Sequence, residues 1–276
     1  MRSGVETGVR TGVRTGVRTG ERLDDGSPLY RADLARHRAA YRFAESYFTA
    51  GPVLDLGSGT GYGADELAAT GRPVVALDRT RPEPRPRSSG ARFVLGDLER
   101  LPFAAGRVDR VASFQVIEHF ADARPYLAEI ARILRPDGTA LFSTPNRLES
   151  DGENPFHLRE YTADELADVL SIHFEQVEIR GIHAHGPAAR YHAERLRQIR
   201  RVTRLDPMGL RRRLPRGLVD WAFARLSVLV RLGVRRRGAM AEVRDEDYRV
   251  EPAGGTCVDL LALCRSPRPV AQPALR

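Results

Sequence analysis

Residues 53–61 read VLDLGSGTG and are the most informative stretch of this chain. A short apolar run interrupted by one acid breaks into three alternating glycines, a pattern typical of a buried parallel strand followed by a tight turn. Glycine suits this turn because a Cβ atom would meet a bound molecule or forbid the backbone conformation. The helix that follows offers its N-terminal N–H groups to a ligand in the turn. We therefore predict that a nucleotide-like cofactor binds here.

The turn alone leaves the identity of that cofactor open. Residues 59–64 read GTGYGA, which also fits the relaxed dinucleotide pattern G-x-G-x-x-A. Three interpretations stand at this point: a dinucleotide site, an S-adenosylmethionine site, or a turn with a purely structural role.

Composition indicates one globular α/β domain with an appendage. The chain has 276 residues, of which 42% are apolar, enough to build a core. All 44 basic residues are arginine, and residues 187–245 hold 16 of them beside five acidic residues. The two cysteines form no disulfide framework. The N-terminus lacks the apolar segment of a signal peptide, so we expect a cytoplasmic protein.

The order of apolar segments predicts a doubly wound, Rossmann-like α/β fold. Strands alternate with helices up to about residue 182, which is typical of a mainly parallel sheet. We expect seven strands, of which the last is antiparallel, and an extended loop at 79–87, where alternate prolines forbid a helix. The predicted strands are 52–56, 73–77, 92–95, 108–113, 139–143, 174–182 and 257–264, and the predicted helices are 31–48, 62–69, 122–134 and 163–170, the last capped by Thr162.

We divide the chain into four parts. Residues 1–26 repeat Thr-Gly-Val-Arg and are expected to be a disordered tail. Residues 27–186 and 251–266 form the predicted α/β domain. Residues 187–250 form a basic helical lid, because this segment leaves and re-enters the sheet on the ligand side. Residues 267–276 are a flexible tail.

Three acids, Asp55, Asp78 and Asp97, stand at the ends of the first three predicted strands. In an open α/β sheet the carboxyl ends of the strands converge on the ligand. Asp78 can accept hydrogen bonds from both hydroxyls of a ribose, and Asp97 can accept one from the exocyclic amine of adenine. Together with the glycine turn they favour an adenosine-containing cofactor.

The chain resembles the class I S-adenosylmethionine-dependent methyltransferases over roughly residues 31–186 and the last strand. The matching segments are VLDLGSGTG at 53–61, Asp78, GDLERLPF at 96–103 and IARILRPDG at 130–138. The resemblance favours S-adenosylmethionine over NAD and makes 27–186 with 251–266 the methyltransferase domain. It implies that the methionine end lies at Asp55 and the glycines, the ribose at Asp78 and the adenine at Asp97. The implied cofactor-binding residues are Asp55, Gly57, Ser58, Gly59, Gly61, Asp78, Asp97, Leu98, Phe114 and Gln115.

Residues 114–120 read FQVIEHF and are similar to the O-methyltransferase branch that includes the ubiquinone-biosynthesis enzymes. Some members of that branch carry Glu-x-x-Glu-His here and bind a divalent ion. This chain has Gln115 in place of the first carboxylate, and because an uncharged amide is a poor ligand for a hard cation, we predict no metal site. His119 in this segment has two interpretations: a general base near the methyl acceptor, or a buried hydrogen-bonding residue that shapes the site.

A second segment, HLREY at 157–161, is similar to a stretch that flanks the acceptor pocket in many relatives. It makes His157 the preferred base beside His119, with Arg159 or Tyr161 orienting the substrate. His183, at the exit of the sixth predicted strand, is a further substrate candidate.

The basic segment contains two predicted helices, 191–203 and 218–234. They have three interpretations: helices that pack as a lid with solvated arginines, an interfacial helix that brings 210–240 to an anionic membrane surface, and a phosphate-binding surface for nucleic acid. Aromatic residues are not interleaved with the arginines, which weighs against nucleic acid as a partner.

We predict an S-adenosylmethionine-dependent methyltransferase that acts on a small-molecule or lipid-like acceptor, with a hydroxyl oxygen as the favoured acceptor atom. The alternatives are an RNA methyltransferase that uses the arginine-rich insertion and a non-catalytic S-adenosylmethionine-binding regulatory protein. The sequence identifies neither the acceptor nor the oligomeric state.

Overall fold

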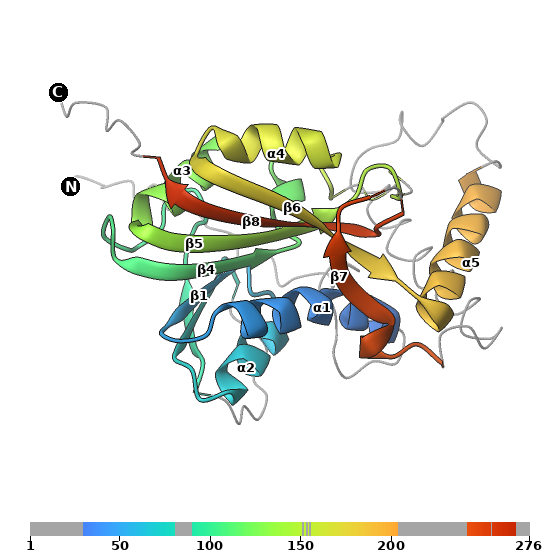
Figure 1. Cartoon of the computed structure of the whole chain (residues 1–276), viewed down its shortest axis with the longest axis horizontal. Coiled ribbons are helices and arrows are strands. Elements are labelled where there is room, and N and C mark those ends of the chain that lie inside the picture. Colours follow the sequence, from blue (N-terminus) through green and yellow to red (C-terminus); the bar gives the residue numbers. More distant parts are fainter. Residues whose placement is uncertain are drawn as a thin grey trace, which may run out of the picture.

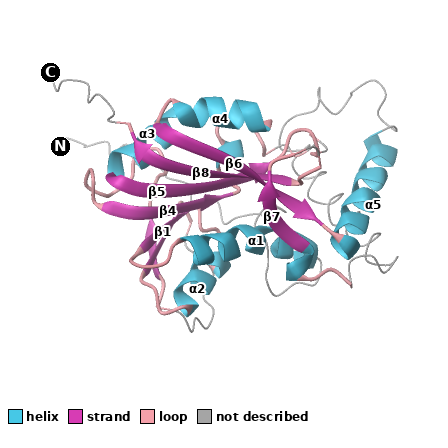
Figure 2. Cartoon of the chain, in the orientation of Figure 1, coloured by secondary structure: helices cyan, strands magenta, loops and turns pink. Residues whose placement is uncertain are grey.

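The computed structural model describes residues 30–80, 90–150, 152, 154, 156–203, 242–254 and 256–268. They form one sheet with helices on both faces (Figures 1 and 2). The strands are β1 Val53–Leu56, β2 Val74–Asp78, β3 Arg92–Leu95, β4 Val108–Phe114, β5 Leu134–Pro145, β6 Phe174–Ala184, β7 Tyr248–Pro252 and β8 Asp259–Pro267. The helices are α1 Arg31–Tyr47, α2 Tyr62–Ala69, α3 Arg124–Ile133, α4 Ala163–Ser171 and α5 Gly186–Thr203, with short 3₁₀ turns η2 Ile117–His119 and η4 Asp245–Asp247.

The strand order is β3-β2-β1-β4-β5-β8-β6-β7. The first five strands in this order pair in parallel, and β8 runs antiparallel to both of its neighbours, β5 and β6. The opposite directions of β6 and β8 are visible in Figure 1. The doubly wound, mainly parallel fold is therefore confirmed. The chain builds outward from β1 to β3 and then returns to β4, so the order reverses between β1 and β4, where such sheets bind their ligands.

Helices cover the sheet on both faces, α1 and α2 on one and α3 and α4 on the other (Figure 1). Every residue of β1 is buried, as expected for a central strand with both faces covered. On the first face Tyr41 and Leu67 pack into the core, and on the second Ile130 and Leu166 do so. α4 begins with the predicted cap: Thr162 Oγ1 accepts a hydrogen bond from the Glu165 amide, and the Glu165 carboxylate accepts one from the Thr162 amide.

The sheet has one strand more than the sequence predicts. β7 pairs antiparallel with β6 at the edge of the sheet, so residues 248–250, which we expected in the lid, belong to the sheet. Its five residues are too few for their apolar pattern to separate a strand from a loop. α5 begins at Gly186 rather than at residue 191 and stands beyond the carboxyl end of β6 (Figure 1).

Some predictions lie outside the described residues. These are the tail 1–26, most of the proline-rich loop 79–87, the helix 218–234, the membrane contact through 210–240 and nearly all of the tail 267–276. Of the helices in the described segments, none combines the length and the apolar character needed to cross a bilayer.

α5 is attached to β7 through a half-buried histidine. His192 Nε2 is hydrogen-bonded to the Tyr248 hydroxyl at 2.9 Å, and the two rings meet edge to face. Burial, with the charges of Arg36 and Arg195, lowers the pKa of His192 to about 3. The neutral ring is therefore part of the packing between α5 and the sheet.

We expect the stability of the fold to depend on pH through His192. Between pH 6.5 and about 3 the unfolded chain binds a proton at this residue and the folded chain does not, so folding weakens as the pH falls. His192→Gln removes this titration, and its free energy of unfolding should rise relative to wild type by about 2 kcal/mol between pH 7 and pH 5 in denaturant titrations. His185→Gln, at a side chain that is 42% exposed, is the control. An identical pH dependence in His192→Gln and wild type would contradict this role.

Candidate functional site

The glycine turn after β1 is tied to the end of β2 by Asp78. Asp78 Oδ2 accepts a hydrogen bond from the Gly59 amide at 2.9 Å, and Oδ1 accepts one from the Thr80 amide at 2.9 Å. The amides of Gly57 and Ser58 donate to the carbonyl of the last β2 leucine. The carboxylate predicted to bind a ribose therefore lies directly beside the glycines predicted to hold the methionine end.

The three glycines of the turn are needed for different reasons. All have φ in the left-handed region, at 75° for Gly57, 56° for Gly59 and 85° for Gly61. A Cβ atom on Gly57 or Gly61 would lie 2.4 or 2.5 Å from a neighbouring side chain, so the protein's own packing excludes it. At Gly59 no heavy atom of the described chain comes within 4 Å of that position. The buried Ser58 hydroxyl also finds no hydrogen-bond partner among the described residues. Both observations fit a site for the predicted cofactor.

Asp55 is a fully buried carboxylate on β1. The Tyr41 hydroxyl of α1 donates to its two oxygens at 3.3 and 3.4 Å. Burial raises the pKa of Asp55 to about 7, the hydrogen bond from Tyr41 opposes this shift, and the charge of Asp78 adds to it. A carboxylate in this environment is stabilised by a cationic partner, which the ammonium group at the methionine end of the cofactor would provide.

The remaining predicted cofactor residues differ in exposure. Phe114 is buried, with its ring 4.9 Å from that of Tyr41, and Leu98 lies in the core. Asp97 is half exposed, and its Oδ1 lies 3.8 Å from the Arg79 guanidinium. The predicted cofactor residues thus follow the ends of four neighbouring strands, β3, β2, β1 and β4. We call the ends of β3, β2 and β1 the cofactor half of this edge, and the turn after Gln115, the ends of β5 and β6 and the start of β8 the acceptor half, with Phe114 and Gln115 at the boundary.

Gln115 stands at the boundary between the two halves, directly after β4. It has φ 56°, a conformation that a residue with a side chain adopts only when its surroundings impose it. The Gln115 backbone amide donates a hydrogen bond to the Ser143 backbone carbonyl at 2.8 Å, and the side-chain Nε2 lies 3.4 Å from Ser143 Oγ. These contacts to β5 hold the strained turn in place.

The segments after β4 and β5 bring His119 and His157 together. Their ring centroids are 5.5 Å apart. His119 Nδ1 is hydrogen-bonded to the Phe156 carbonyl at 3.0 Å. Because a carbonyl can only accept, Nδ1 carries the proton, and in the neutral ring Nε2 is the basic nitrogen. The two residues predicted as base candidates therefore form one histidine pair on the acceptor half.

A carboxylate that sequence analysis did not assign completes this pair. His157 Nδ1 lies 2.6 Å from Glu160 Oε1, which also accepts a hydrogen bond from the Ser150 hydroxyl at 2.9 Å. Although burial alone would raise it, the hydrogen bonds from His157 and Ser150 lower the pKa of Glu160. The ionised carboxylate orients the ring of His157. In the sequence, only the three-residue spacing of His157 and Glu160 indicates that the two side chains can meet.

Glu118 connects the two loops that carry the histidines. Its Oε2 accepts a hydrogen bond from the Thr144 hydroxyl at 3.0 Å, and its backbone carbonyl accepts from the amides of Leu158 and Arg159. Burial raises the pKa of Glu118, and the nearby His119 opposes this shift. The loop after β5 is thereby fixed against the turn after β4.

The three predicted substrate residues lie in different environments. Arg159 is exposed, with its guanidinium 5.0 Å above the ring of Tyr161, and Tyr161 is fully buried. His183 Nε2 is hydrogen-bonded to the Pro252 carbonyl of β7 at 3.1 Å. Their contact with a substrate stays a prediction. Within the described segments, no three His, Cys, Asp or Glu side chains come together as metal ligands.

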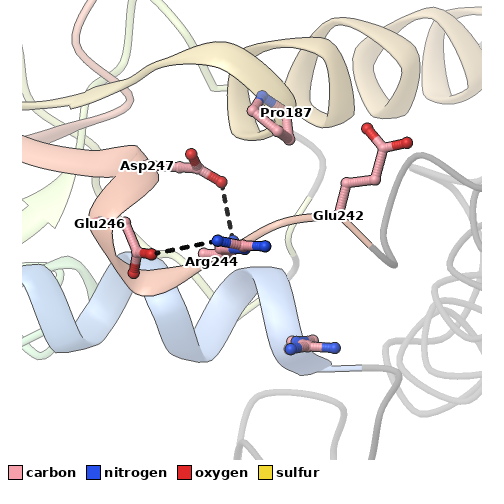
Figure 3. A pocket seen from close by; sticks show the side chains of 6 residues that line it. Pro187, Glu242, Arg244, Glu246 and Asp247 are labelled. Carbon is pink, nitrogen blue, oxygen red and sulfur yellow. Dashed lines mark hydrogen bonds and ion pairs between the residues drawn. The ribbon is translucent and has the colours of Figure 1, made fainter.

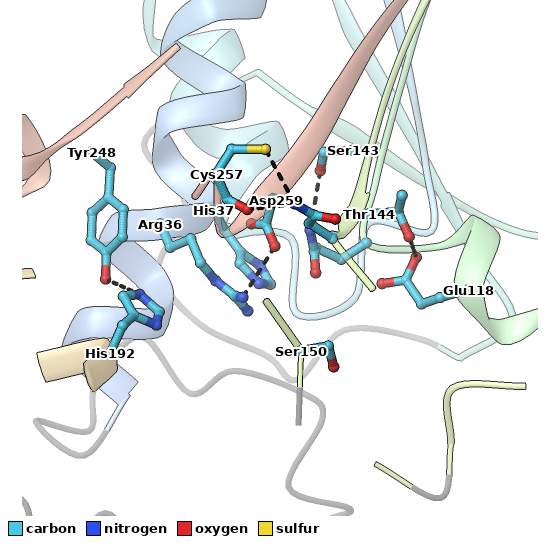
Figure 4. A network of polar contacts seen from close by, with 12 residues as sticks. Arg36, His37, Glu118, Ser143, Thr144, Ser150, His192, Tyr248, Cys257 and Asp259 are labelled. Carbon is cyan, nitrogen blue, oxygen red and sulfur yellow. Dashed lines mark hydrogen bonds and ion pairs between the residues drawn. The ribbon is translucent and has the colours of Figure 1, made fainter. Parts of the chain in front are cut away.

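An ion pair between α1 and β8 also lies on the acceptor half, and sequence analysis missed it. Arg36 Nη1 is 3.1 Å from Asp259 Oδ1 (Figure 4). Asp259 is fully buried at the start of β8, opposite the last residue of β5. Burial raises the pKa of Asp259 to about 6, while the charge of Arg36 opposes the shift. Next to this pair Asn146 donates to the Cys257 carbonyl at 2.9 Å.

A separate cavity of about 540 Å³ lies between the start of α1, the start of α5 and the segment before β7 (Figure 3). In its wall, the Arg244 guanidinium lies 3.9 Å from the Glu246 carboxylate, and the Arg244 backbone amide donates a hydrogen bond to Asp247 Oδ2. Its lining contains neither the glycine turn nor the histidine pair, so it is distinct from the predicted site. The lining residues are Arg31, Pro187, Glu242, Arg244, Glu246 and Asp247.

Comparison with known proteins gives consistent matches. Residues 54–142 match the family model described as a methyltransferase domain. A Mycobacterium tuberculosis protein named a probable S-adenosylmethionine-dependent methyltransferase is 40% identical over 164 residues, which are 56% of this chain and 60% of that protein. A malonyl-[acyl-carrier protein] O-methyltransferase of Serratia marcescens is 36% identical over 95 residues, 33% of this chain and 37% of that protein. The crystal structure of a SAM-dependent methyltransferase from Thermotoga maritima matches with a TM-score of 0.54 at 14% identity, over 86% of this chain and 92% of that one, and shows the same fold.

This chain spans 60% of the length of its M. tuberculosis relative. The family model covers β1 through most of β5, and with them the glycine turn, Asp78, Asp97 and Phe114. The matched domain and the name of the M. tuberculosis relative both indicate a methyltransferase, and the doubly wound sheet is the fold expected from the sequence. Residues 54–142 thus match a methyltransferase domain, and S-adenosylmethionine is the cofactor of that domain.

Proposed function

We propose that the protein transfers a methyl group to a hydroxyl oxygen of a small-molecule or lipid-like acceptor. The observation that carries this proposal is the histidine pair on the acceptor half, with His157 backed by the Glu160 carboxylate at 2.6 Å. A hydroxyl must lose its proton when it is methylated, and a histidine oriented by a carboxylate is suited to take that proton. The Serratia relative, named an O-methyltransferase, supports transfer to oxygen.

On the cofactor half, the glycine turn, Asp55 and Asp78 would hold S-adenosylmethionine. When bound, this cofactor supplies an activated methyl group on a sulfonium. Asp55 would bind the ammonium of the methionine end, and Asp78 the ribose hydroxyls, in line with the open space at Gly59. The task left to the protein is orientation of the acceptor and removal of its proton.

On the acceptor half, His157 is the proposed base. Glu160 accepts the Nδ1 proton of His157, so in the neutral ring Nε2 is the basic nitrogen that would take the proton of the acceptor hydroxyl. His119, 5.5 Å away, is the second candidate for the same step. In this scheme Glu160 stabilises the imidazolium that forms.

α5, the described start of the basic segment, is proposed as part of the cover of the acceptor half. α5 starts two residues after β6 ends, and the hydrogen bond between His192 and Tyr248 holds it against β7. A cover of this kind excludes water from the methyl transfer.

The cofactor assignment predicts a loss of affinity in Asp78→Ala. Isothermal titration calorimetry with S-adenosylhomocysteine should show about 100-fold weaker binding, because hydrogen bonds to a charged group contribute about 1.5–3 kcal/mol each. Asp168→Ala, at an exposed position of α4, is the matched control and should bind like wild type. Equal affinity in Asp78→Ala and wild type would show that the ribose lies elsewhere.

The base assignment predicts a loss of turnover in His157→Ala. With an acceptor found by screening hydroxyl compounds with radiolabelled S-adenosylmethionine, kcat should fall by about 10²–10⁴-fold while the affinity for S-adenosylhomocysteine stays unchanged. Glu160→Gln should lower kcat less, and His173→Ala, which follows α4, should leave it unchanged. If neither His157→Ala nor His119→Ala lowers kcat, the base assignment is wrong. A wild-type protein that binds the cofactor but turns over no acceptor would favour the regulatory alternative.

A further inference from the structure

The ion pair of Arg36 and Asp259 lies on the acceptor half but has no part in the proposed proton transfer. Arg36 comes from α1 and Asp259 from the first position of β8, so the pair joins two segments far apart in the sequence. Figure 4 shows the pair beside His37, with Glu118 and Thr144 further along the same edge. Glu118 lies close enough for its charge to raise the pKa of Asp259.

Three buried polar atoms at this place lack a hydrogen-bond partner within the described part of the chain. They are Arg36 Nε, Asp259 Oδ2 and Glu118 Oε1, although the Gln115 side chain lies close enough to Asp259 for its hydrogen bonding to lower the pKa of that carboxyl. Asp259 and Glu118 are fully buried residues. Leaving a buried donor or acceptor unsatisfied costs about 1–3 kcal/mol, and native proteins rarely do so without a ligand or an ordered water. The unsatisfied atoms thus mark a place for a polar group that the described residues do not supply.

The types of these atoms restrict that group. Arg36 Nε can only donate a hydrogen bond, and the ionised Asp259 Oδ2 can only accept one. A carboxylate or phosphate has no proton to give to Asp259, and it would add negative charge beside Asp259, Glu118 and the buried Asp33. An ammonium has no lone pair for Arg36 Nε. A neutral hydroxyl has the groups that both atoms need, since its oxygen can accept from Arg36 and its proton can be donated to Asp259.

We propose that the Arg36–Asp259 pair is a binding subsite for an uncharged hydroxyl of the methyl acceptor. This inference rests on the proposed function and narrows it, because it makes the acceptor a hydroxyl compound without an acidic group at this position. Arg36 and Asp259 are specificity residues in this assignment, and the proton transfer stays with the histidine pair.

The test uses three probes that share one ring and differ in one group: phenol, benzoate and benzylammonium. Each is titrated near neutral pH into the full chain saturated with S-adenosylhomocysteine, and binding is followed by saturation-transfer NMR. Wild-type protein should bind phenol about tenfold more tightly than either charged probe, since each charged probe leaves one buried atom unsatisfied.

The variant Asp259→Asn tests the subsite more directly than the comparison of probes on wild-type protein. The amide oxygen of asparagine would keep the hydrogen bond from Arg36, and its NH₂ group would take the place of Oδ2, so the subsite changes from acceptor to donor. The preference should shift towards benzoate by about tenfold or more relative to phenol, whereas a merely structural role would weaken all probes alike. Asp137→Asn, at an exposed position of β5, is the matched control with the wild-type preference.

Calorimetry with S-adenosylhomocysteine separates the possible failures. Wild-type affinity in Asp259→Asn shows that the variant is folded and that its cofactor half is intact. Failure of the wild-type chain to bind S-adenosylhomocysteine would overturn the proposed function. Normal binding of S-adenosylhomocysteine, combined with no phenol binding or with an unchanged probe preference in Asp259→Asn, would overturn the subsite alone.

Discussion

Burial of carboxylates at the carboxyl-end edge of the sheet is the constraint on which this architecture depends. Asp55, Glu118 and Asp259 are fully buried there, and a buried charge is tolerated only when it is paired or hydrogen-bonded. α1 supplies two of the partners, the Tyr41 hydroxyl to Asp55 and the Arg36 guanidinium to Asp259. The helix that precedes the first strand is therefore part of the site, because it holds the charges of both halves in place.

The cofactor half could be predicted from the sequence because its parts are local. The glycine turn, Asp78 and Asp97 each follow a strand directly, and parallel pairing brings those strand ends together. The acceptor half could be predicted only in part. His119 and His157 belong to recognisable segments of sequence, but Asp259 meets Arg36 across 223 positions of sequence, and no local pattern encodes such a contact.

The difference between local and distant contacts also explains which details of the structure the sequence predicts and which it does not. The capping box of α4 was predicted because its two residues are three positions apart, whereas β7 was missed because its pairing with β6 depends on the path of the chain between them. Tyr161, predicted to orient the substrate, is fully buried, which a tyrosine next to a charged pair does not reveal in the sequence, and its contact with a substrate stays a prediction. Glu160 shows the opposite case, since a residue that resembles an ordinary surface acid becomes the partner of His157.

The central claim is that the edge is divided into a cofactor half and an acceptor half at the reversal between β1 and β4. Hydrogen–deuterium exchange with and without S-adenosylhomocysteine tests this division most directly. The account predicts slower amide exchange in residues 57–63, 78–80 and 97–98, with residues 156–161 and 256–260 unchanged. Protection centred on 156–161 and 256–260, without protection of the glycine turn, would contradict it.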